Sequence, residues 1–456
     1  MNHGPVRIGL LGAGTVGGAL IELIQKEHDT LEARTGLDLQ IARVAVSSVG
    51  QRRRFSLPAG VLVDDPMAVA VADDVDVVVE LIGGLDPAHQ LVMAALGAGK
   101  PVVTANKELI ATAGSSLAAA ATASGVDLLF EAAVGGAIPL VRPLRESLAG
   151  ERITRVMGIV NGTTNYVLTR MSETSSSYEE AVSEAQQLGY AERDPTADVE
   201  GHDAAAKAAI LATLAFGIEV TASDVSREGI TSLRQDDVAD ARRLGYEVKL
   251  LALAERLATP LPASDGHGGR DPGGHELSHG VSVRVYPAMV PRSHPLAAVR
   301  GAHNAVFIEG AAVGELMLYG RGAGGTPTAA AVLGDLIDAA HNRMNRTASR
   351  ANVVRRVPLA SSAEQESAFY VSIDVMDRPG VLAAVAGIFG EHRVSIRSME
   401  QIGLGDEARL VFLTHKAREA DMATTLKDLE ALPSVERVGV LLRVLGEGSH
   451  EVNRGA

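Results

Sequence analysis

The chain has 456 residues, of which 46 % are hydrophobic and 21 % charged, a composition typical of a globular protein of about three domains. Its formal net charge of −14 argues against nucleic acid as a partner, because phosphate binding needs clustered lysine and arginine. The absence of cysteine excludes disulfides, thiolate nucleophiles and cysteine-ligated zinc, and it is compatible with a cytoplasmic location. No apolar run reaches the roughly 18 residues of a membrane-spanning helix, and no secretory pattern is found, so we expect no membrane partner.

Strand-like and helical segments alternate over the first part of the chain, which predicts a doubly wound parallel sheet of the Rossmann type. The expected strands are residues 6–11, 40–46, 75–81, 101–104 and 126–132. The expected helices run from residue 18 to about 32, from 88 to 96, and from about 108 onwards. We assign residues 1–136 to this domain.

The motif Gly12-x-Gly14-x-x-Gly17 follows the first expected strand and opens the first helix. The motif alone is weak evidence, and an ordinary glycine-rich turn is the alternative. Its position favours dinucleotide binding, because free N–H groups at a helix start can face a pyrophosphate. The expected cofactor contacts in this turn are Gly12, Ala13, Gly14, Thr15, Val16 and Gly17.

The end of the second expected strand bears on the choice of cofactor. An acidic residue that binds the ribose hydroxyl of NAD normally stands there, but this chain has Val46-Ser47-Ser48, with Arg52, Arg53 and Arg54 soon after. The missing carboxylate and the nearby arginines favour NADP, with Arg52 as a phosphate contact. NAD stays open, since a solvated basic loop explains the same residues.

The character of the sequence changes near residue 137, where we expect an α+β domain over residues 137–310. Its expected helices are 140–149, 178–188, 202–216 and 238–257, and its expected strands are 152–161, 281–287 and 304–310. Glycine, proline and serine dominate residues 259–279, which predicts a flexible surface insert. The histidines at 267, 275 and 279 lack carboxylate support, so we do not assign them a metal.

The last part of the chain predicts a helix over residues 328–346, a linker over 346–367, and a small domain over 368–445. The small domain is expected to run strand, Asp377–Gly380 turn, helix (381–392), two strands, helix (418–431) and strand. This order predicts a compact α+β module.

Between Ala185 and Lys207 several carboxylates precede one lysine. Asp203 and Lys207 are four residues apart at the start of an alanine-rich helix, so they share a face. A carboxylate beside a lysine in a closed site can hold the ammonium in place and tune its pKa. Spacing alone leaves a solvated ion pair equally open.

The segment 185–207 resembles homoserine dehydrogenase, of the monofunctional bacterial type with a C-terminal ACT domain. Segments 104–107, 131–139, 161–166 and 322–328 share the resemblance, which covers residues 5 to 345. It implies reversible reduction of L-aspartate 4-semialdehyde to L-homoserine with NAD(P)H, on the route to threonine, methionine and isoleucine. It also implies that residues 311–345 complete the Rossmann domain and that residues 137–310 bind substrate and form a dimer.

The resemblance also implies roles for single residues. Lys207 would donate a proton to the carbonyl oxygen as hydride arrives, and Asp203 would orient Lys207. Lys107 is a second candidate for the proton transfer, and binding of phosphate or carboxylate is an equally open role for it. The implied substrate contacts are Gly189, Glu192, Asp198, Asp203 and Thr163. The implied further cofactor contacts are Thr104, Lys107, Gly322, Gly324 and Gly325.

Glu131, with the main-chain carbonyls of Val134, Gly136 and Ile138, matches the family's structural sodium site. The spacing in a glycine-rich hinge suits oxygen ligation of a hard cation. A strand end and domain hinge without a metal is the alternative.

Residues 369–382 resemble the start of an ACT domain, which implies a ferredoxin-like, four-stranded antiparallel sheet backed by two helices. ACT domains pair, and they bind amino acids where the first strand turns into the helix, so threonine is the expected effector. An ACT domain used only for assembly is the alternative. The resemblance implies a homo-oligomer, either a dimer or a tetramer.

Overall fold

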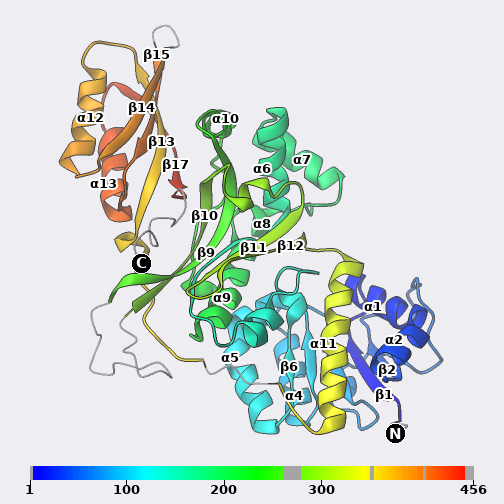
Figure 1. Cartoon of the computed structure of the whole chain (residues 1–456). Coiled ribbons are helices and arrows are strands. Elements are labelled where there is room, and N and C mark those ends of the chain that lie inside the picture. Colours follow the sequence, from blue (N-terminus) through cyan, green and yellow to red (C-terminus); the bar gives the residue numbers. More distant parts are fainter. Residues whose placement is uncertain (1–3, 261–278, 350–353, 404–406, 447–456) are drawn as a thin grey trace. The chain divides into compact units, whose positions relative to one another are not determined.

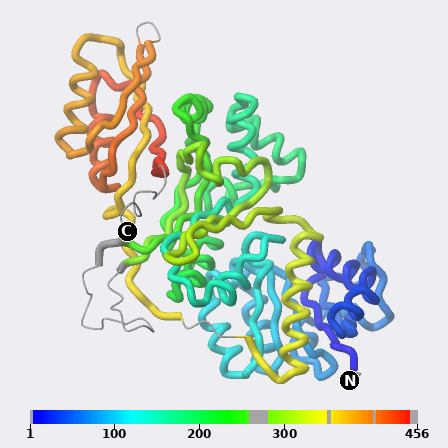
Figure 2. Tube along the Cα trace, in the orientation of Figure 1, coloured from blue at the N-terminus to red at the C-terminus, as the bar shows by residue number. Residues whose placement is uncertain are grey.

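The computed structural model of the chain describes residues 4–260, 279–349, 354–403 and 407–446 (Figure 1). The chain folds into two compact units, each built from three separate stretches. The first unit comprises Met1–Ile153, Ala206–Asp224 and Asn304–Val357, and the second comprises Thr154–Ala205, Val225–His303 and Pro358–Ala456. The stretches of the two units therefore alternate along the chain. In Figure 2 the first unit includes both the blue and cyan N-terminal part and the yellow segment that follows residue 304.

The first unit contains a six-stranded parallel sheet with the strand order β3-β2-β1-β4-β5-β6. Its strands are β1 (Val6–Leu11), β2 (Leu39–Ala45), β3 (Leu62–Val63), β4 (Val77–Glu80), β5 (Val102–Thr104) and β6 (Leu128–Leu129). The order reverses at β1, which pairs in parallel with both β2 and β4. This arrangement confirms the predicted doubly wound sheet, and ligands of such sheets bind at the carboxyl ends of the strands where the order reverses.

Helices cover this sheet. They are α1 (Thr15–Lys26), α2 (His28–Thr35), α3 (Pro66–Ala70), α4 (Ala88–Gly97), α5 (Lys107–Ser124) and α11 (Gly325–Asn345), with short η1 (Glu131–Ala133) and η2 (Pro143–Ser147). Helices α1 and α11 pack together, and Leu20 and Leu336 share one core with Ile8 of β1. The single helix predicted from residue 18 to about 32 is wrong, because the chain turns at Glu27 and starts α2.

The second unit is built on a long hairpin. Strands β9 (Tyr246–Pro260) and β10 (His279–Pro291) pair in antiparallel fashion, with β7 (Ile153–Ile159) beside β9 and β8 (Ser226–Arg227) beside β10. The other elements are α6 (Gly162–Thr174), α7 (Tyr178–Gln187), α8 (Thr196–Val199), η3 (Ala222–Asp224), α10 (Gln235–Arg243) and η4 (Pro295–Ala298). Helix α9 (His202–Phe216), β11 (His303–Gly310) and β12 (Gly314–Arg321) complete the elements before α11.

The predicted helix over residues 238–257 is wrong in its second half. Helix α10 ends at Arg243, Gly245 adopts a left-handed backbone (φ +90°), and β9 follows. A continuous apolar run such as Leu250–Ala254 is buried on both faces of a strand, and periodicity does not distinguish it from a buried helix. Of the predicted insert, residues 259 and 260 end β9 and residue 279 begins β10, while residues 261–278 lie outside the described residues.

The C-terminal part confirms the predicted small domain with four main strands and two helices. Its elements are β13 (Glu366–Met376), α12 (Val381–Glu391), β14 (Ile396–Gly403), β15 (Glu407–Thr414), β16 (Ala417–Arg418), α13 (Glu419–Glu430) and β17 (Val435–Val444), preceded by η5 (Ser362–Glu364). The sheet order is β17-β13-β15-β14, with antiparallel pairs throughout. Phe369, Phe389 and Phe412 centre its core. Strand β17 also pairs in parallel with β10, so one sheet runs through the second unit.

No helix in the described part of the chain combines the length and the apolar character that crossing a membrane requires.

Candidate active site

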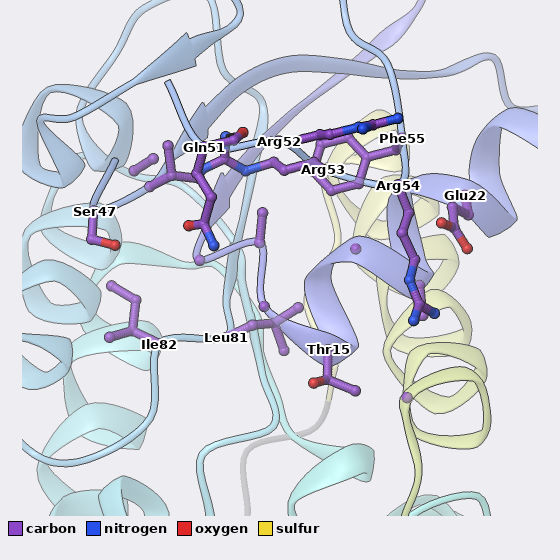
Figure 3. Close-up of a pocket in the computed structure, with 18 of the residues that line it drawn as sticks. Thr15, Glu22, Ser47, Gln51, Arg52, Arg53, Arg54, Phe55, Leu81 and Ile82 are labelled. Atoms are coloured by element: carbon purple, nitrogen blue, oxygen red, sulfur yellow. Dashed lines mark hydrogen bonds between the residues drawn. The ribbon is translucent and has the colours of Figure 1, made fainter. Parts of the chain in front are cut away.

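A cavity of about 940 Å³ opens in the first unit where β1 leads into α1 (Figure 3). The turn residues Gly12, Ala13, Gly14 and Thr15 form its floor, and Gly325 at the start of α11 joins them. This is the switch point of the sheet, between β1 and β4. The sequence-predicted cofactor turn therefore lines a cavity large enough for a dinucleotide.

Glycine is required at two positions of this turn. Gly12 has φ +96°, and a Cβ there would lie 2.8 Å from the Leu81 carbonyl oxygen. A Cβ on Gly17 would lie 2.3 Å from the Gly12 carbonyl oxygen. Helix α1 starts after Gly14 with no side-chain cap, so its first N–H groups are left for a ligand. A helix start of this kind binds phosphate.

The three consecutive arginines differ in what they contact, although all line the cavity. Arg53 donates to the carbonyls of Ser48, Val49 and Gln51, so it stabilises its own loop. Within the described residues, no hydrogen bond or ion pair is found for Arg52 or Arg54. Figure 3 shows this loop passing over Thr15 and the first turn of α1. The cationic groups open to a ligand are therefore Arg52 and Arg54.

The remaining predicted cofactor residues do not line the cavity. Val16 and Gly17 belong to the first turn of α1. The Thr104 hydroxyl donates to the fully buried Glu80 at 2.6 Å, and Glu80 in turn accepts from the N–H groups of Ile82 and Gly83. Lys107 is the first residue of α5. Gly322 precedes α11, and Gly324 caps it with φ +123°. Glu80 shapes the loop after β4, and it was not among the predicted site residues.

In the second unit a polar cluster brings together three of the predicted substrate residues. The Asn161 amide donates to Asp198 at 2.7 Å and to Asp203 at 2.8 Å. The Thr163 hydroxyl lies 2.9 Å from the Asp198 carboxylate and 2.7 Å from the Tyr190 carbonyl. Asn161 also caps α6 by accepting from the Thr164 N–H. Asn161 was not predicted as a site residue, yet it joins the two carboxylates.

Two other predicted substrate residues are not part of this cluster. Gly189 and Glu192 lie in the loop between α7 and α8, where Gly189 has φ +75°. The Glu192 side chain is exposed, and its main-chain carbonyl accepts from Gln186. A substrate contact by Glu192 thus depends on its carboxylate rather than on a preformed network.

Lys207 lies on α9, one turn after Asp203. Lys207 is only 9 % exposed and Asp203 only 6 %. The surrounding alanines 204, 205, 206, 208 and 209 are all buried. This burial excludes the solvated ion pair that spacing alone left open, since a charge is buried only where partners or a ligand offset the cost.

The segment of the expected sodium ligands is held by Glu131. Its carboxylate accepts from the N–H groups of Leu140, Val141 and Arg142 at 2.5, 2.8 and 2.8 Å. Its own N–H donates to Asp335 at 2.7 Å, and burial raises the pKa of Asp335 to about 7. Val134, Gly136 and Ile138 are buried. Asp335 lies 204 residues further along the chain, so sequence spacing could not indicate it.

Comparison with known proteins places this geometry in a family. Residues 139–337 match the family model described as homoserine dehydrogenase, and residues 12–131 match the one described as homoserine dehydrogenase, NAD binding domain. Residues 369–434 match the ACT domain. A homoserine dehydrogenase of Mycobacterium tuberculosis is 47 % identical over 451 residues, which cover 97 % of this chain and 98 % of that protein.

The chain belongs to the homoserine dehydrogenase family.

Two further relatives agree with this assignment. A homoserine dehydrogenase of Corynebacterium glutamicum is 46 % identical and covers 96 % of this chain and 95 % of its own. The crystal structure of a homoserine dehydrogenase from Thiobacillus denitrificans superposes with a TM-score of 0.86 at 36 % identity, covering 98 % of this chain and 99 % of that one. The predicted family is confirmed, and homoserine dehydrogenases are NAD(P)-dependent oxidoreductases. The Gly12 turn belongs to the part of the chain that matches the NAD binding domain of that family.

Proposed function

We propose that this homoserine dehydrogenase reduces L-aspartate 4-semialdehyde to L-homoserine, reversibly, on the route to threonine, methionine and isoleucine in the cytoplasm. The balanced reaction takes one NAD(P)H and one proton to give NAD(P)⁺. The carrying observation is the pair of carboxylates, Asp198 and Asp203, that share the Asn161 amide. Asp203 lies one helical turn before the buried Lys207.

Lys207 is the proposed proton donor. NAD(P)H, when bound, supplies the hydride, and negative charge then develops on the carbonyl oxygen of the substrate. A positioned ammonium stabilises that charge and delivers the proton. Asp203, one helical turn before Lys207 on α9, would orient the Lys207 ammonium.

The carboxylates also suit the other end of the substrate. Asp198, Asp203 and Glu192 offer acceptors for a substrate ammonium, while Thr163 and the Gly189 loop position it. The Thr163 hydroxyl and the Asn161 amide already orient Asp198 and Asp203, so ligand binding requires little reorganisation.

Lys107 is a second lysine with a proposed role in the reaction. It starts α5 directly after β5, and the carboxyl end of a parallel strand is where ligands of such sheets bind. Lys107 has two candidate roles, which are to share the proton transfer or to bind a phosphate or carboxylate. The kinetics of Lys107→Ala separate these roles.

NADP is the proposed preferred cofactor. Arg52 and Arg54 line the cavity, and no acidic side chain stands at Val46-Ser47-Ser48 to bind a ribose 2′-hydroxyl. An archaeal homoserine dehydrogenase, 28 % identical and with a TM-score of 0.58, has been solved in complex with NADPH. Gly12, Gly14, Thr15, Gly17 and Gly325 would hold the pyrophosphate side of the cofactor.

A structural sodium ion is proposed at Glu131 and the carbonyls of Val134, Gly136 and Ile138. The donor chemistry fits a hard monovalent cation, since it combines one carboxylate with carbonyls of a buried turn. Gly135 and Gly136 are left-handed, and a Cβ on Gly136 would lie 2.4 Å from the Gly322 carbonyl oxygen. Replacing sodium and potassium by a bulky organic cation should lower the melting temperature; an unchanged melting temperature would remove the proposal.

The ACT domain is the proposed regulatory domain, with threonine as its effector and pairing of copies into a dimer or tetramer. Threonine titration read by activity and by thermal shift tests the first idea, and light scattering tests the second. If threonine changed neither the activity nor the melting temperature, the ACT domain would be assigned a role in assembly alone.

Homoserine-dependent reduction of NADP, followed at the nicotinamide absorbance, tests the function. Lys207→Ala should lower kcat by roughly 10²–10⁴-fold while cofactor affinity stays unchanged. Lys107→Ala should lower kcat if Lys107 shares the proton transfer and raise KM alone if it only binds. Lys416→Ala, an exposed lysine of the ACT domain, is the control. Near wild-type turnover in Lys207→Ala would refute the assignment.

A further inference from the structure

A further cavity, of about 220 Å³, lies in the second unit, and its lining does not include Asn161, Thr163, Asp198 or Asp203. Strands β8 and β10, the turn η5 and the first residues of α13 enclose it. It is also separate from the turn between β13 and α12, where ACT domains are expected to bind amino acids. None of the proposed catalytic, cofactor or sodium residues lines it.

Two buried arginines form the inner wall. The guanidinium carbons of Arg284 and Arg443 lie 5.3 Å and 5.2 Å from the centroid of the Tyr286 ring. All three donor nitrogens of the Arg443 guanidinium are satisfied, because Nε and Nη2 donate to Glu419 and Nη1 donates to Glu228. Arg443 therefore fixes Glu228 and Glu419 at the cavity.

Arg284 is different, because part of its guanidinium has no acceptor. It is 5 % exposed, and its Nη2 donates to Glu255 at 2.7 Å. Its Nε and Nη1 are buried and have no hydrogen-bond partner in the described part of the chain. The nearest carboxylate to Nη1 is Glu419 at 3.7 Å, which is beyond hydrogen-bond distance. A buried donor left unpaired costs about 1–3 kcal/mol, and more when it is charged, so an acceptor from a ligand is favoured.

The charges of the wall restrict the class of ligand. Arg284 and Arg443 are matched by Glu228 and Glu419, so the lining is neutral overall and would not offset the charge of a polyphosphate or a dicarboxylate. Ala363, Ala420 and Ala423 keep the space open, and the exposed Ser226 and Ser362 border it. A small molecule with one carboxylate and one ammonium fits both the charges and the volume.

We propose that this cavity binds a small zwitterionic α-amino acid, whose carboxylate accepts from Arg284 and whose ammonium donates to Glu228 or Glu419. The ligand joins β10 to the first turn of α13, two elements that Arg443 already connects. Its binding therefore stabilises the junction between the central hairpin and the ACT domain. The proposal is independent of the proposed reaction.

Calorimetric titration of the full-length protein with glycine, L-serine and L-threonine tests the proposal. Acetate and ethylamine, each carrying one half of the zwitterion, are the comparison ligands. At least one of the amino acids should bind, and both half-ligands should bind roughly tenfold or more weakly, which corresponds to about 1.4 kcal/mol or more. If acetate bound as tightly as the best amino acid, the claim that the cavity recognises both charges of a zwitterion would be refuted. If no amino acid gave a heat of binding, the claim that the cavity binds an amino acid would be refuted.

Two matched variants on α13 locate the binding. Ala423→Leu fills the cavity from an exposed helical position, and Thr424→Leu adds the same side chain at the neighbouring exposed position that does not line the cavity. We expect Ala423→Leu to abolish the heat of binding and Thr424→Leu to retain it, with equal melting temperatures without ligand. Equal binding by Ala423→Leu and Thr424→Leu would overturn the proposal. It would also be overturned if Arg378→Ala, at the β13–α12 turn, lost binding while Ala423→Leu retained it.

Discussion

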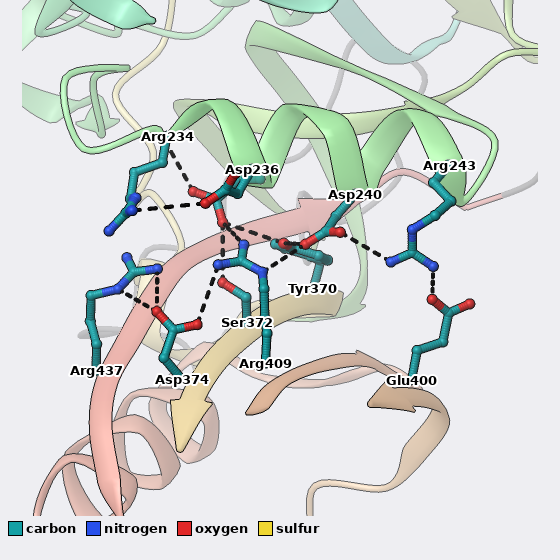
Figure 4. Close-up of polar contacts among 11 residues, drawn as sticks. Arg234, Asp236, Asp240, Arg243, Tyr370, Ser372, Asp374, Glu400, Arg409 and Arg437 are labelled. Atoms are coloured by element: carbon teal, nitrogen blue, oxygen red, sulfur yellow. Dashed lines mark hydrogen bonds and ion pairs between the residues drawn. The ribbon is translucent and has the colours of Figure 1, made fainter. Parts of the chain in front are cut away.

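The Arg409 Nη2 donates to the Asp237 carboxylate at 3.0 Å, and Asp237 has no exposed surface. Arg409, on β15 of the ACT sheet, also donates to Asp240 at 3.1 Å (Figure 4), so it pairs with two carboxylates of α10. Tyr370 donates to Asp240, and Ser372 donates to Asp237. Burial raises the pKa of Tyr370, which keeps that hydroxyl protonated. Within the second unit, α10 is therefore attached to the ACT sheet by a buried ion-pair network.

Arg409→Met should destabilise the protein strongly. Removing the one guanidinium leaves Asp237 and Asp240 buried without their counter-charge, and breaking a buried pair in this way costs about 3–5 kcal/mol. Urea unfolding followed by circular dichroism measures the loss. Arg397→Met, which removes an exposed arginine from β14 of the same sheet, is the control and should change stability little. Equal stability of the two variants would show that the network is not needed for docking.

Arg52 and Arg54 should determine the preference for NADP, and Arg53 should not. Within the described part of the chain, Arg52 and Arg54 form no ion pair. Replacing both by serine therefore removes the two positive charges that are open to a phosphate. Loss of charge-assisted hydrogen bonds worth about 1.5–3 kcal/mol should raise KM for NADP by roughly 10–100-fold and leave KM for NAD nearly unchanged. Arg53→Ser should disturb its loop and affect both cofactors alike. Steady-state kinetics with both cofactors measures this, and a parallel change in the double variant would contradict the assignment.

Asn161→Asp should impair substrate use without removing the cap of α6. The new carboxylate still accepts from the Thr164 N–H, but it places a third negative charge beside Asp198 and Asp203 in place of a shared donor. We expect kcat/KM for homoserine to fall roughly 10–100-fold, with KM for NADP unchanged. Asn165→Ala, on the same helix, removes an amide that donates to the Gly301 carbonyl and should lower stability alone. Equal kinetic losses in both variants would argue that Asn161 is purely structural.

Much of the fold could be predicted, because it is encoded in local patterns. The alternation of short apolar runs with helical segments specified the Rossmann sheet, and Gly12-x-Gly14-x-x-Gly17 specified the turn that lines the larger cavity. The strand, turn and helix pattern predicted the small C-terminal domain, and the resemblance of residues 369–382 identified it as an ACT domain. The strand β9 was missed, because Leu250–Ala254 carry no polar residue to show the period of two.

The site could be predicted only in part, since its supporting contacts are non-local. Asp203 and Lys207 are four residues apart on α9, so their position on one face of the helix could be predicted from the sequence. The amide of Asn161 reaches Asp203 across 42 residues, and Asp335 reaches Glu131 across 204, so no spacing indicates either. The different roles of Arg52, Arg53 and Arg54 depend on where the loop carbonyls point, which composition does not determine.

Lys249 should make stability depend on alkaline pH. This side chain is buried in β9, where its ammonium donates to the Asn165 side chain and to the Val299 carbonyl. Burial, only partly offset by Glu247, lowers the pKa of Lys249 to about 8, whereas an unfolded lysine titrates near 10.4. Between these values the unfolded state binds more protons than the folded state. Stability therefore rises with pH across this window, by roughly 3 kcal/mol if the whole shift is expressed.

Lys249→Met isolates this contribution, because it retains the aliphatic stem and removes the titrating group. The unfolding free energy of the unsubstituted protein minus that of the variant should be constant below pH 8 and should increase up to about pH 10. Other titrating groups cancel in this difference, provided that they are unaffected by the substitution. A difference that stays flat over the same range would contradict the lowered pKa of Lys249 and show that the carbonyl, the amide and Glu247 fully offset its burial.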